Sequence, residues 1–139
     1  MMGRAFSSNC YCVNLRRSAG AVSNYYDRAL SGLGITASQF YLLFTLDRLE
    51  YAHGTQLAEA VGLDRSTMVR NVRLLVEHGW IQEVVKGRGK NFSLTASGKA
   101  VLEQGRPCWE EAQAELERYL GEDDTKAILR IGEKLKNLE

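Results

Sequence analysis

The sequence has no long apolar run, because none of its apolar stretches exceeds a few residues. A transmembrane helix needs about 20 apolar residues in a row, so no membrane span is expected. The first twenty residues carry Arg4, Arg16 and Arg17 but no continuous apolar stretch or small-residue cleavage site, which argues against a secretory signal. We therefore expect a cytoplasmic protein with no membrane partner.

Cysteine is scarce, and its number is odd: the chain has only Cys10, Cys12 and Cys108. The Cys-x-Cys spacing is tighter than the Cys-x-x-Cys of zinc or thioredoxin-like sites, and three cysteines do not describe a disulfide framework. The simplest interpretation is free thiols that pack as small apolar groups in a reducing compartment.

Histidine is also scarce, since His53 and His78 are the only two. Neither stands in a two-histidine ligand spacing or beside a Ser or Cys in a nucleophile motif. The run Glu122-Asp-Asp124 lacks the acid spacing of a calcium loop, and we interpret it as a helix start. We therefore expect no metal, no cofactor and no enzyme activity.

The composition that remains is that of one soluble globular domain. Its 139 residues are 45% hydrophobic and 25% charged, which is ordinary for a folded chain. The net charge is only +1, but residues 64–90 contain six Arg or Lys against three acids, and residues 110–139 contain nine acids against five bases. This segregation suggests that one surface faces a polyanion and another faces away from it.

Apolar residues recur at helical spacing through the first half of the chain. They predict a long first helix over residues 8–30. Thr36 and Gln39 have the form of a capping box, which predicts the start of a central helix over residues 37–50.

A helix-turn-helix pattern follows. Thr55 is expected to cap a short helix that ends at Gly62, and Asp64 is expected to cap a second helix over residues 65–78. An apolar stripe on this second helix is expected to pack inward, and it comprises Met68, Val69, Val72, Leu75 and Val76.

The opposite face of the helix over residues 65–78 is rich in hydrogen-bond donors. Its outer row is Ser66, Arg70 and Arg73, flanked by Thr67 and Asn71. Ser and Thr suit phosphate and base-edge contacts, Arg can bind guanine bidentately, and Asn can do the same for adenine. Such a face fits the major groove, although a polar face with two Arg is by itself usually only a solvated face.

The segment after Gly79 changes from helical to extended character. Residues 80–85 and 91–94 favour strands, and Lys86-Gly-Arg-Gly-Lys90 between them predicts a tight turn. Arg88 and Lys90 give this hairpin a cationic tip suited to the minor groove or to phosphates. The short helix upstream and this hairpin downstream are what favour DNA binding over a merely solvated face.

Two further helices are expected to complete the chain. Thr95 can cap a long helix over residues 96–120, which we expect to be kinked or broken near Pro107 because proline has no amide hydrogen. An Asp at 123 or 124 is expected to cap the last helix. The apolar stripe of that helix is Ile128, Leu129, Ile131, Leu135 and Leu138.

Several segments carry a family resemblance. They are Gly34-Ile-Thr-Ala-Ser-Gln-Phe-Tyr-Leu-Leu43, Leu57-Ala-Glu-Ala-Val-Gly-Leu-Asp-Arg-Ser-Thr-Met68 and Leu94-Thr-Ala-Ser-Gly98. In this order and spacing they resemble the MarR family of bacterial transcriptional regulators. Cys10-x-Cys12-x-x-Leu15-Arg-Arg17 and Trp109 with Ala112-Gln113 resemble one subgroup of that family, so the resemblance covers nearly the whole chain.

The resemblance implies a mainly α fold with a small antiparallel β-hairpin wing, in a single domain over residues 1–139. It implies a winged helix-turn-helix DNA-binding region over residues 36–98, and a dimerisation region formed by the helices over residues 8–34 and 106–139. The implied partners are a second copy of the chain and double-stranded DNA with a palindromic operator. The implied function is a transcriptional regulator, generally a repressor, that a small aromatic or phenolic effector or an oxidant releases.

The resemblance also implies site residues. Carried over by position, Ser66, Thr67, Arg70 and Asn71 are the expected groove readers, and Arg88 is the expected wing arginine. The full expected DNA-binding set is Arg65, Ser66, Thr67, Arg70, Asn71, Arg73, Arg88 and Lys90. Many relatives have an Asp-x-Arg before the second wing strand, whereas the wing here is shorter and lacks that Asp, which leaves open how its tip is braced.

Two alternatives stay open. A winged helix can serve as a protein-interaction scaffold, although this would give the outward set on residues 65–78 no reason to exist. Separately, Cys10, Cys12 and Cys108 would all lie near the implied dimer base, so a disulfide between the first and the long helix could sense an oxidant.

Overall fold

A computed structural model of the protein describes residues 9–138. The elements in chain order are α2 (Tyr11–Leu30), η1 (Ser31–Leu33), α3 (Ala37–Leu49), β1 (Ala52–His53), α4 (Gly54–Val61), α5 (Arg65–Glu77), β2 (Ile81–Val84), β3 (Asn91–Leu94), α6 (Ala96–Leu120) and α7 (Glu122–Leu135). The molecule is mainly helical with a small antiparallel sheet, so the expected fold class is confirmed.

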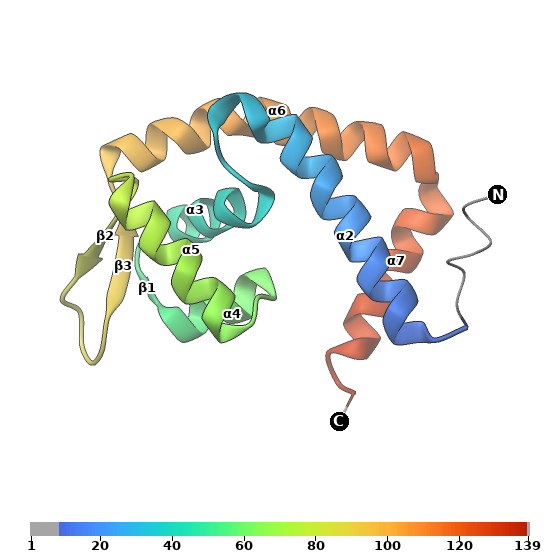
Figure 1. Ribbon diagram of the computed structural model, residues 1–139, viewed down its shortest axis with the longest axis horizontal. Helices are drawn as coiled ribbons and strands as arrows, with labels where there is room; N and C mark the ends of the chain where they lie inside the picture. The colour runs from blue at the N-terminus through green and yellow to red at the C-terminus, as the bar shows by residue number, and fades with distance from the viewer. Residues whose placement is uncertain (1–8, 139) are drawn as a thin grey trace.

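The long helix α6 forms the upper edge of the molecule and joins its two halves (Figure 1). The helices α3, α4 and α5 and the sheet lie below one end of α6, and α2 and α7 extend below the other end. The basic residues 64–90 and most of the acidic residues 110–139 thereby lie in different halves of the molecule, as the charge segregation along the sequence suggested.

The sheet has three strands in the order β1-β3-β2, one more than the sequence predicted. The hairpin pairs Ile81 with Leu94 and Val84 with Asn91, as two antiparallel strands. The additional strand β1 is only two residues long, and it pairs Ala52 with Phe92 on the other edge of β3. It attaches the hairpin to the segment that follows α3.

The core lies around α3, whose buried residues are Phe40, Leu42, Leu43, Thr45 and Leu46. Burying one Leu or Phe side chain stabilises a fold by about 1.5–3 kcal/mol, so this helix contributes a large share of the apolar stabilisation. Its capping box is present as predicted: Thr36 Oγ1 accepts from the Gln39 amide, and Gln39 Oε1 accepts from the Thr36 amide, both at 3.2 Å.

Two glycines let α6 approach its neighbours closely. A Cβ on Gly98 would lie 1.9 Å from the Trp80 carbonyl oxygen, and one on Gly105 would lie 2.7 Å from Cε1 of Phe40. The N-terminus of α6 is held at the same place, because Thr95 Oγ1 accepts from the Gly98 amide and donates to the Gly79 carbonyl. α6 is therefore packed against both α3 and the start of the wing.

The sequence predicted α6 with the right ends. Pro107 lies inside one continuous helix of 25 residues, so of the two expected outcomes, a kink or a break, the break does not occur. The missing proline amide removes only one backbone hydrogen bond, and the close contact of Gly105 with Phe40 holds this part of α6 against α3.

Two predicted helix caps are also wrong. The first helix is present from Tyr11, and its expected start at about residue 8 lies outside the described residues. The short helix α4 has His53 at its N-cap and not Thr55, because β1 runs directly into it. The last helix has Gly121 at its N-cap, so Asp123 and Asp124 lie inside its first turn. Their negative charges interact favourably there with the positive end of the helix dipole.

The apolar stripe of the last helix is left largely exposed by residues 9–138. Ile128, Leu129 and Ile131 on α7 are 54%, 75% and 44% exposed.

Among residues 9–138, no single helix is long and apolar enough to cross a membrane. Residues 11–33 and 37–49 have the required length and apolarity only when they are counted together, and a bend of 76° separates them.

Candidate nucleic-acid interface

The helix α5 begins at a well-formed cap. Asp64 Oδ1 accepts from the Thr67 amide at 2.8 Å and from the Ser66 hydroxyl at 3.0 Å. The hydrogen bond from the Thr67 backbone, followed by those from the Thr67 and Ser66 side chains, lowers the pKa of Asp64 below its usual value. The predicted cap is confirmed, and it fixes the end of α5 that carries Ser66 and Thr67.

The faces of α5 are arranged as the sequence predicted, with one correction. Met68, Val72 and Leu75 are 6%, 7% and 0% exposed, so they attach the helix to the core. The outer row is exposed, and it consists of Ser66, Arg70 and Arg73. Arg65 is also exposed, whereas the flanking Thr67 and Asn71 are half-buried.

The correction concerns Val69 and Val76, which were expected to pack inward. They are 45% and 43% exposed. The buried stripe of α5 is narrower than its apolar stripe, because the wing stands away from this side of the helix and leaves a cleft of about 950 Å³. Val69 and Val76 line this cleft.

The cleft between α5 and the wing has an apolar floor and a charged rim. Met68, Val72 and Phe92 contribute to the floor. The cations of the rim come from both elements, and they are Arg65 and Arg73 on α5 with Arg88 and Lys90 on the wing. Four of the eight predicted DNA-binding residues therefore line one concave surface.

The wing turn is braced by a residue that the sequence analysis did not single out. Asn91 is 2% exposed, and its Nδ2 donates to the Lys86 carbonyl at 2.7 Å, which closes the turn. Gly87 and Gly89 take φ values of 68° and 73°, as the predicted tight turn requires. Lys90 Nζ lies 3.8 Å from Glu83 Oε1 across the hairpin, so the chain braces its short wing without the Asp that many MarR relatives have.

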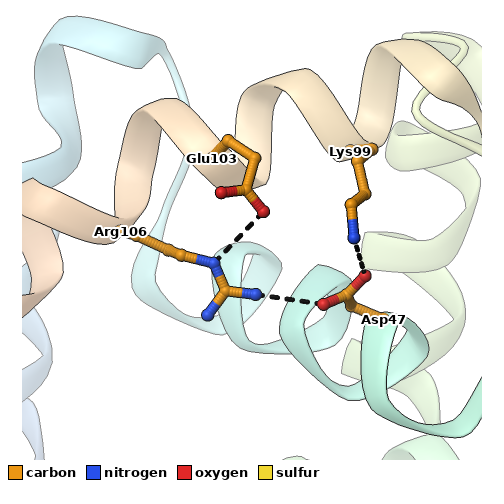
Figure 2. A network of polar contacts seen from close by, with 4 residues as sticks. All are labelled: Asp47, Lys99, Glu103 and Arg106. Carbon is orange, nitrogen blue, oxygen red and sulfur yellow. Dashed lines mark hydrogen bonds and ion pairs between the residues drawn. The ribbon is translucent and has the colours of Figure 1, made fainter.

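An ionic cluster joins the winged half to α6 (Figure 2). Asp47 on α3 accepts from Lys99 Nζ at 2.6 Å with one carboxylate oxygen and from Arg106 Nη2 at 3.0 Å with the other. Glu103 Oε1 lies 3.3 Å from Arg106 Nε on the same helix. The Asp47 side chain is only 21% exposed, so this cluster is less solvated than the other ion pairs described in the structure.

A second, smaller cleft lies where α2, α3, α4 and α6 meet. Its volume is about 370 Å³, and its aromatic lining is Tyr26, Tyr41 and Trp109. The rings of Tyr26 and Trp109 stack with centroids 6.5 Å apart, and the Tyr26 hydroxyl donates to Gln113 Oε1. Burial, followed by the nearby charge of Glu117, raises the pKa of Tyr26.

Cys10, Cys12 and Cys108 are not joined in disulfides. Cys10 and Cys12 are exposed at the start of α2, where Cys12 Sγ accepts from Arg16 Nη2 at 3.4 Å. Cys108 is half-buried in the middle of α6 and therefore lies on a different element. In the part of the chain from residue 9 to residue 138, no three His, Cys, Asp or Glu side chains are placed to hold a metal ion.

Most of the chain matches a known family. Residues 28–117 match the family described as the HVO_A0261 N-terminal domain. This range begins near the end of α2 and includes the helix-turn-helix, the wing and most of α6. A comparison with curated proteins finds no match.

Transcriptional regulators are among the solved structures similar to this chain. MosR from M. tuberculosis is 29% identical with a TM-score of 0.83, over 93% of this chain and 97% of that chain. A structure of MosR in complex with DNA is 29% identical with a TM-score of 0.79, over 92% and 97% of the two chains. The repressor CouR bound to p-coumaroyl-CoA is 21% identical with a TM-score of 0.78, over 94% of each chain.

The regulator MarR from E. coli has the same fold. A mutant of it in complex with operator DNA is 23% identical to this chain with a TM-score of 0.75, over 87% of this chain and 89% of that chain. The likenesses to MarR and CouR extend over both halves of the molecule, and at these identities they concern the fold alone.

Proposed function

Because the chain belongs to the family of the HVO_A0261 N-terminal domain and has the fold of the MarR-family regulators, we propose that it is a transcriptional regulator that binds double-stranded DNA. In this proposal α5 enters the major groove and the wing contacts the neighbouring backbone or minor groove. The observation that carries the proposal is the exposed row of Ser66, Arg70 and Arg73, held outward by three buried residues on the opposite side of α5.

The cleft between α5 and the wing supports this arrangement. A winged protein places its helix and its wing in adjacent grooves, so one sugar-phosphate strand passes between them. Arg65, Arg73, Arg88 and Lys90 line that space, and cations there would neutralise phosphate charge. The similarity to MosR, which is solved with DNA, supports the same use of this surface.

The regulator acts as a homodimer on a palindromic operator in our proposal. The exposed apolar stripe of α7 supports this, because contiguous exposed apolar side chains typically mark an interaction surface. A twofold pair of α5 helices would read two half-sites, so the two-fold symmetry of the dimer would appear in the operator.

We further propose that the protein represses transcription until an effector releases it. The aromatic lining of the cleft at Tyr26, Tyr41 and Trp109 supports a small aromatic or phenolic effector, since it lies between α2 and the winged half. An oxidant is the second candidate signal, because Cys10 and Cys12 are exposed. Two thiols would lose two protons and two electrons to hydrogen peroxide, which gives one disulfide and two molecules of water.

The first experiment is a gel shift with the intergenic DNA upstream of the gene that encodes the chain. A shifted complex that unlabelled specific DNA displaces more effectively than random DNA supports the proposal. No complex at low salt would favour a protein-interaction scaffold instead, because even non-specific binders shift DNA under those conditions.

The signal is tested with the same DNA. Affinity is compared among the reduced protein, the peroxide-treated protein and a variant with Cys10, Cys12 and Cys108 replaced by Ser. An oxidant signal requires that peroxide weaken only the chain with its cysteines, and unchanged affinity in all three samples leaves the small-molecule effector as the release mechanism.

A further inference from the structure

The orientation of the Asn71 side-chain amide on α5 is determined by a contact with α3. Gln39, on the first turn of α3, donates from Nε2 to Asn71 Oδ1 at 3.2 Å. The other end of the same Gln39 amide, Oε1, accepts from the backbone N–H of Thr36 at 3.2 Å. Gln39 and Asn71 are both half-buried, so the hydrogen bond between them is partly shielded from water.

The backbone N–H of Thr36 determines the direction of both hydrogen bonds. A backbone N–H can only donate, so the atom of Gln39 that faces it must be the oxygen. The NH₂ group of Gln39 then faces Asn71, and since it can only donate, the atom of Asn71 that receives it must be Oδ1. Asn71 thus directs Oδ1 toward Gln39 on α3. That oxygen keeps a second lone pair, but Nδ2 is the end of the amide that is directed away from Gln39.

This orientation bears on what Asn71 can recognise. Bidentate recognition of adenine needs Oδ1 to accept from N6 while Nδ2 donates to N7. Building on the proposed function, we infer that Asn71 contacts DNA with its donor, Nδ2, and that Gln39 is the positioning residue that keeps Oδ1 directed toward α3. Its partner is an acceptor, either a phosphate oxygen or N7 and O6 of guanine, and not the adenine edge that Asn alone suggested.

Gln39→Glu reverses the amide while keeping the helix cap. Glutamate accepts from the Thr36 amide just as glutamine does, because the capping box uses either residue. The second carboxylate oxygen then faces Asn71 and can only accept, so Asn71 must turn Nδ2 inward and Oδ1 outward. Asn71→Asp also places an acceptor outward but leaves every group of α3 unchanged, and Asn71→Ala removes both ends.

The measurement is selection of binding sites from a randomised pool of duplex DNA, followed by Kd values for the selected sites and their single-base variants. The wild-type site should contain no adenine that depends on Asn71. Gln39→Glu, Asn71→Asp and Asn71→Ala should each raise Kd, by about three- to tenfold for one lost hydrogen bond. A loss at one guanine assigns the base edge as partner, and an equal loss on all sequences assigns a phosphate.

The added charge of Gln39→Glu is controlled by making the same change in the Asn71→Ala chain. In that background Gln39→Glu can act only through charge repulsion, so it should raise Kd by a smaller factor than it does in the wild type. Thermal unfolding shows whether each variant is folded, and Asn71→Asp carries the test if Gln39→Glu is not.

Three results separate the possibilities. An adenine preference that Asn71→Ala abolishes and Gln39→Glu leaves intact would overturn the inference. Equal effects of Gln39→Glu in the wild-type and Asn71→Ala chains would overturn it too, because Gln39 would then act without Asn71. If the wild type enriches no DNA at all, the proposed function fails instead.

Discussion

Asp47 on α3 and Arg106 on α6 form an ion pair of 3.0 Å that joins the winged half of the molecule to its long helix. Lys99 binds the other oxygen of the same carboxylate, and it lies about two helical turns before Arg106 on α6, nearer the wing. In the proposed regulator this contact lies between the part that reads DNA and the helices that we expect at the dimer interface. Asp47 is therefore the acidic residue through which two basic side chains of α6 bind α3.

Asp47→Asn should lower the free energy of unfolding by about 1–2 kcal/mol, because hydrogen bonds to charged groups are worth more than neutral ones. The matched control is Lys126→Ala, which breaks an i,i+4 pair with Glu122 whose side chains are 70% and 78% exposed. That change should stay within about 0.5 kcal/mol. Denaturant unfolding measures both, and equal effects would mean that the Asp47 cluster adds no more than a surface pair.

Gly98→Ala should destabilise the protein, since its Cβ would lie 1.9 Å from the Trp80 carbonyl oxygen. Overpacking of this kind costs about 1–3 kcal/mol, and here the obstacle is backbone that cannot rotate away. Gly20→Ala in the middle of α2 is the control, because a Cβ there meets nothing within 4 Å. This change should stabilise the protein, since a glycine inside a helix lowers stability by about 0.5–1 kcal/mol relative to alanine. Thermal melts should move in opposite directions, and a shared direction would contradict the close contact.

Lys90→Ala should weaken DNA binding similarly on all sequences and flatten its salt dependence. Each phosphate contact that is lost reduces the slope of log K against log salt by about 0.9. Binding measured over a series of salt concentrations gives this slope. An unchanged slope would show that Lys90 serves only to brace the wing through Glu83.

Leu129→Glu tests the expected dimer interface, because Leu129 is a 75% exposed apolar side chain on α7. A charge buried in an interface without a partner is costly, so the variant should shift toward monomer in light scattering. Val85→Glu makes the same change at a 96% exposed position on the wing, and it should leave the oligomeric state unchanged. If Leu129→Glu has the same mass as the wild type, α7 is not the interface.

The sequence predicts best those features that depend on neighbouring residues. The caps at Thr36 and Asp64, the glycine turn of the wing and the three buried positions of α5 follow from spacing within one element, and the structure has all of them. The strand β1 could not be predicted in this way, because it is two residues long and exists only through its pairing with β3.

Contacts between distant segments account for the remaining differences. Val69 and Val76 belong to the apolar stripe, but helical periodicity alone does not indicate where the wing stops covering it. The bond between Gln39 and Asn71 joins residues 32 positions apart, and the brace of the wing by Asn91 depends on a hairpin register. In the candidate site, the sequence predicted the outward row of Ser66, Arg70 and Arg73. It did not predict Gln39 and Asn91, the groups that orient Asn71 and the wing turn.

The central claim is that the outer face of α5 reads DNA, and Arg70 tests it most directly because it is exposed in the middle of that face. The measurement is the Kd of wild type and Arg70→Ala for the site that the wild type selects and for its single-base variants, with Lys126→Ala on α7 as the control. We expect Arg70→Ala to lose about 1–3 kcal/mol and to relax specificity at one position in each half-site, while Lys126→Ala binds like the wild type. Wild-type affinity and base preference in Arg70→Ala would contradict the account.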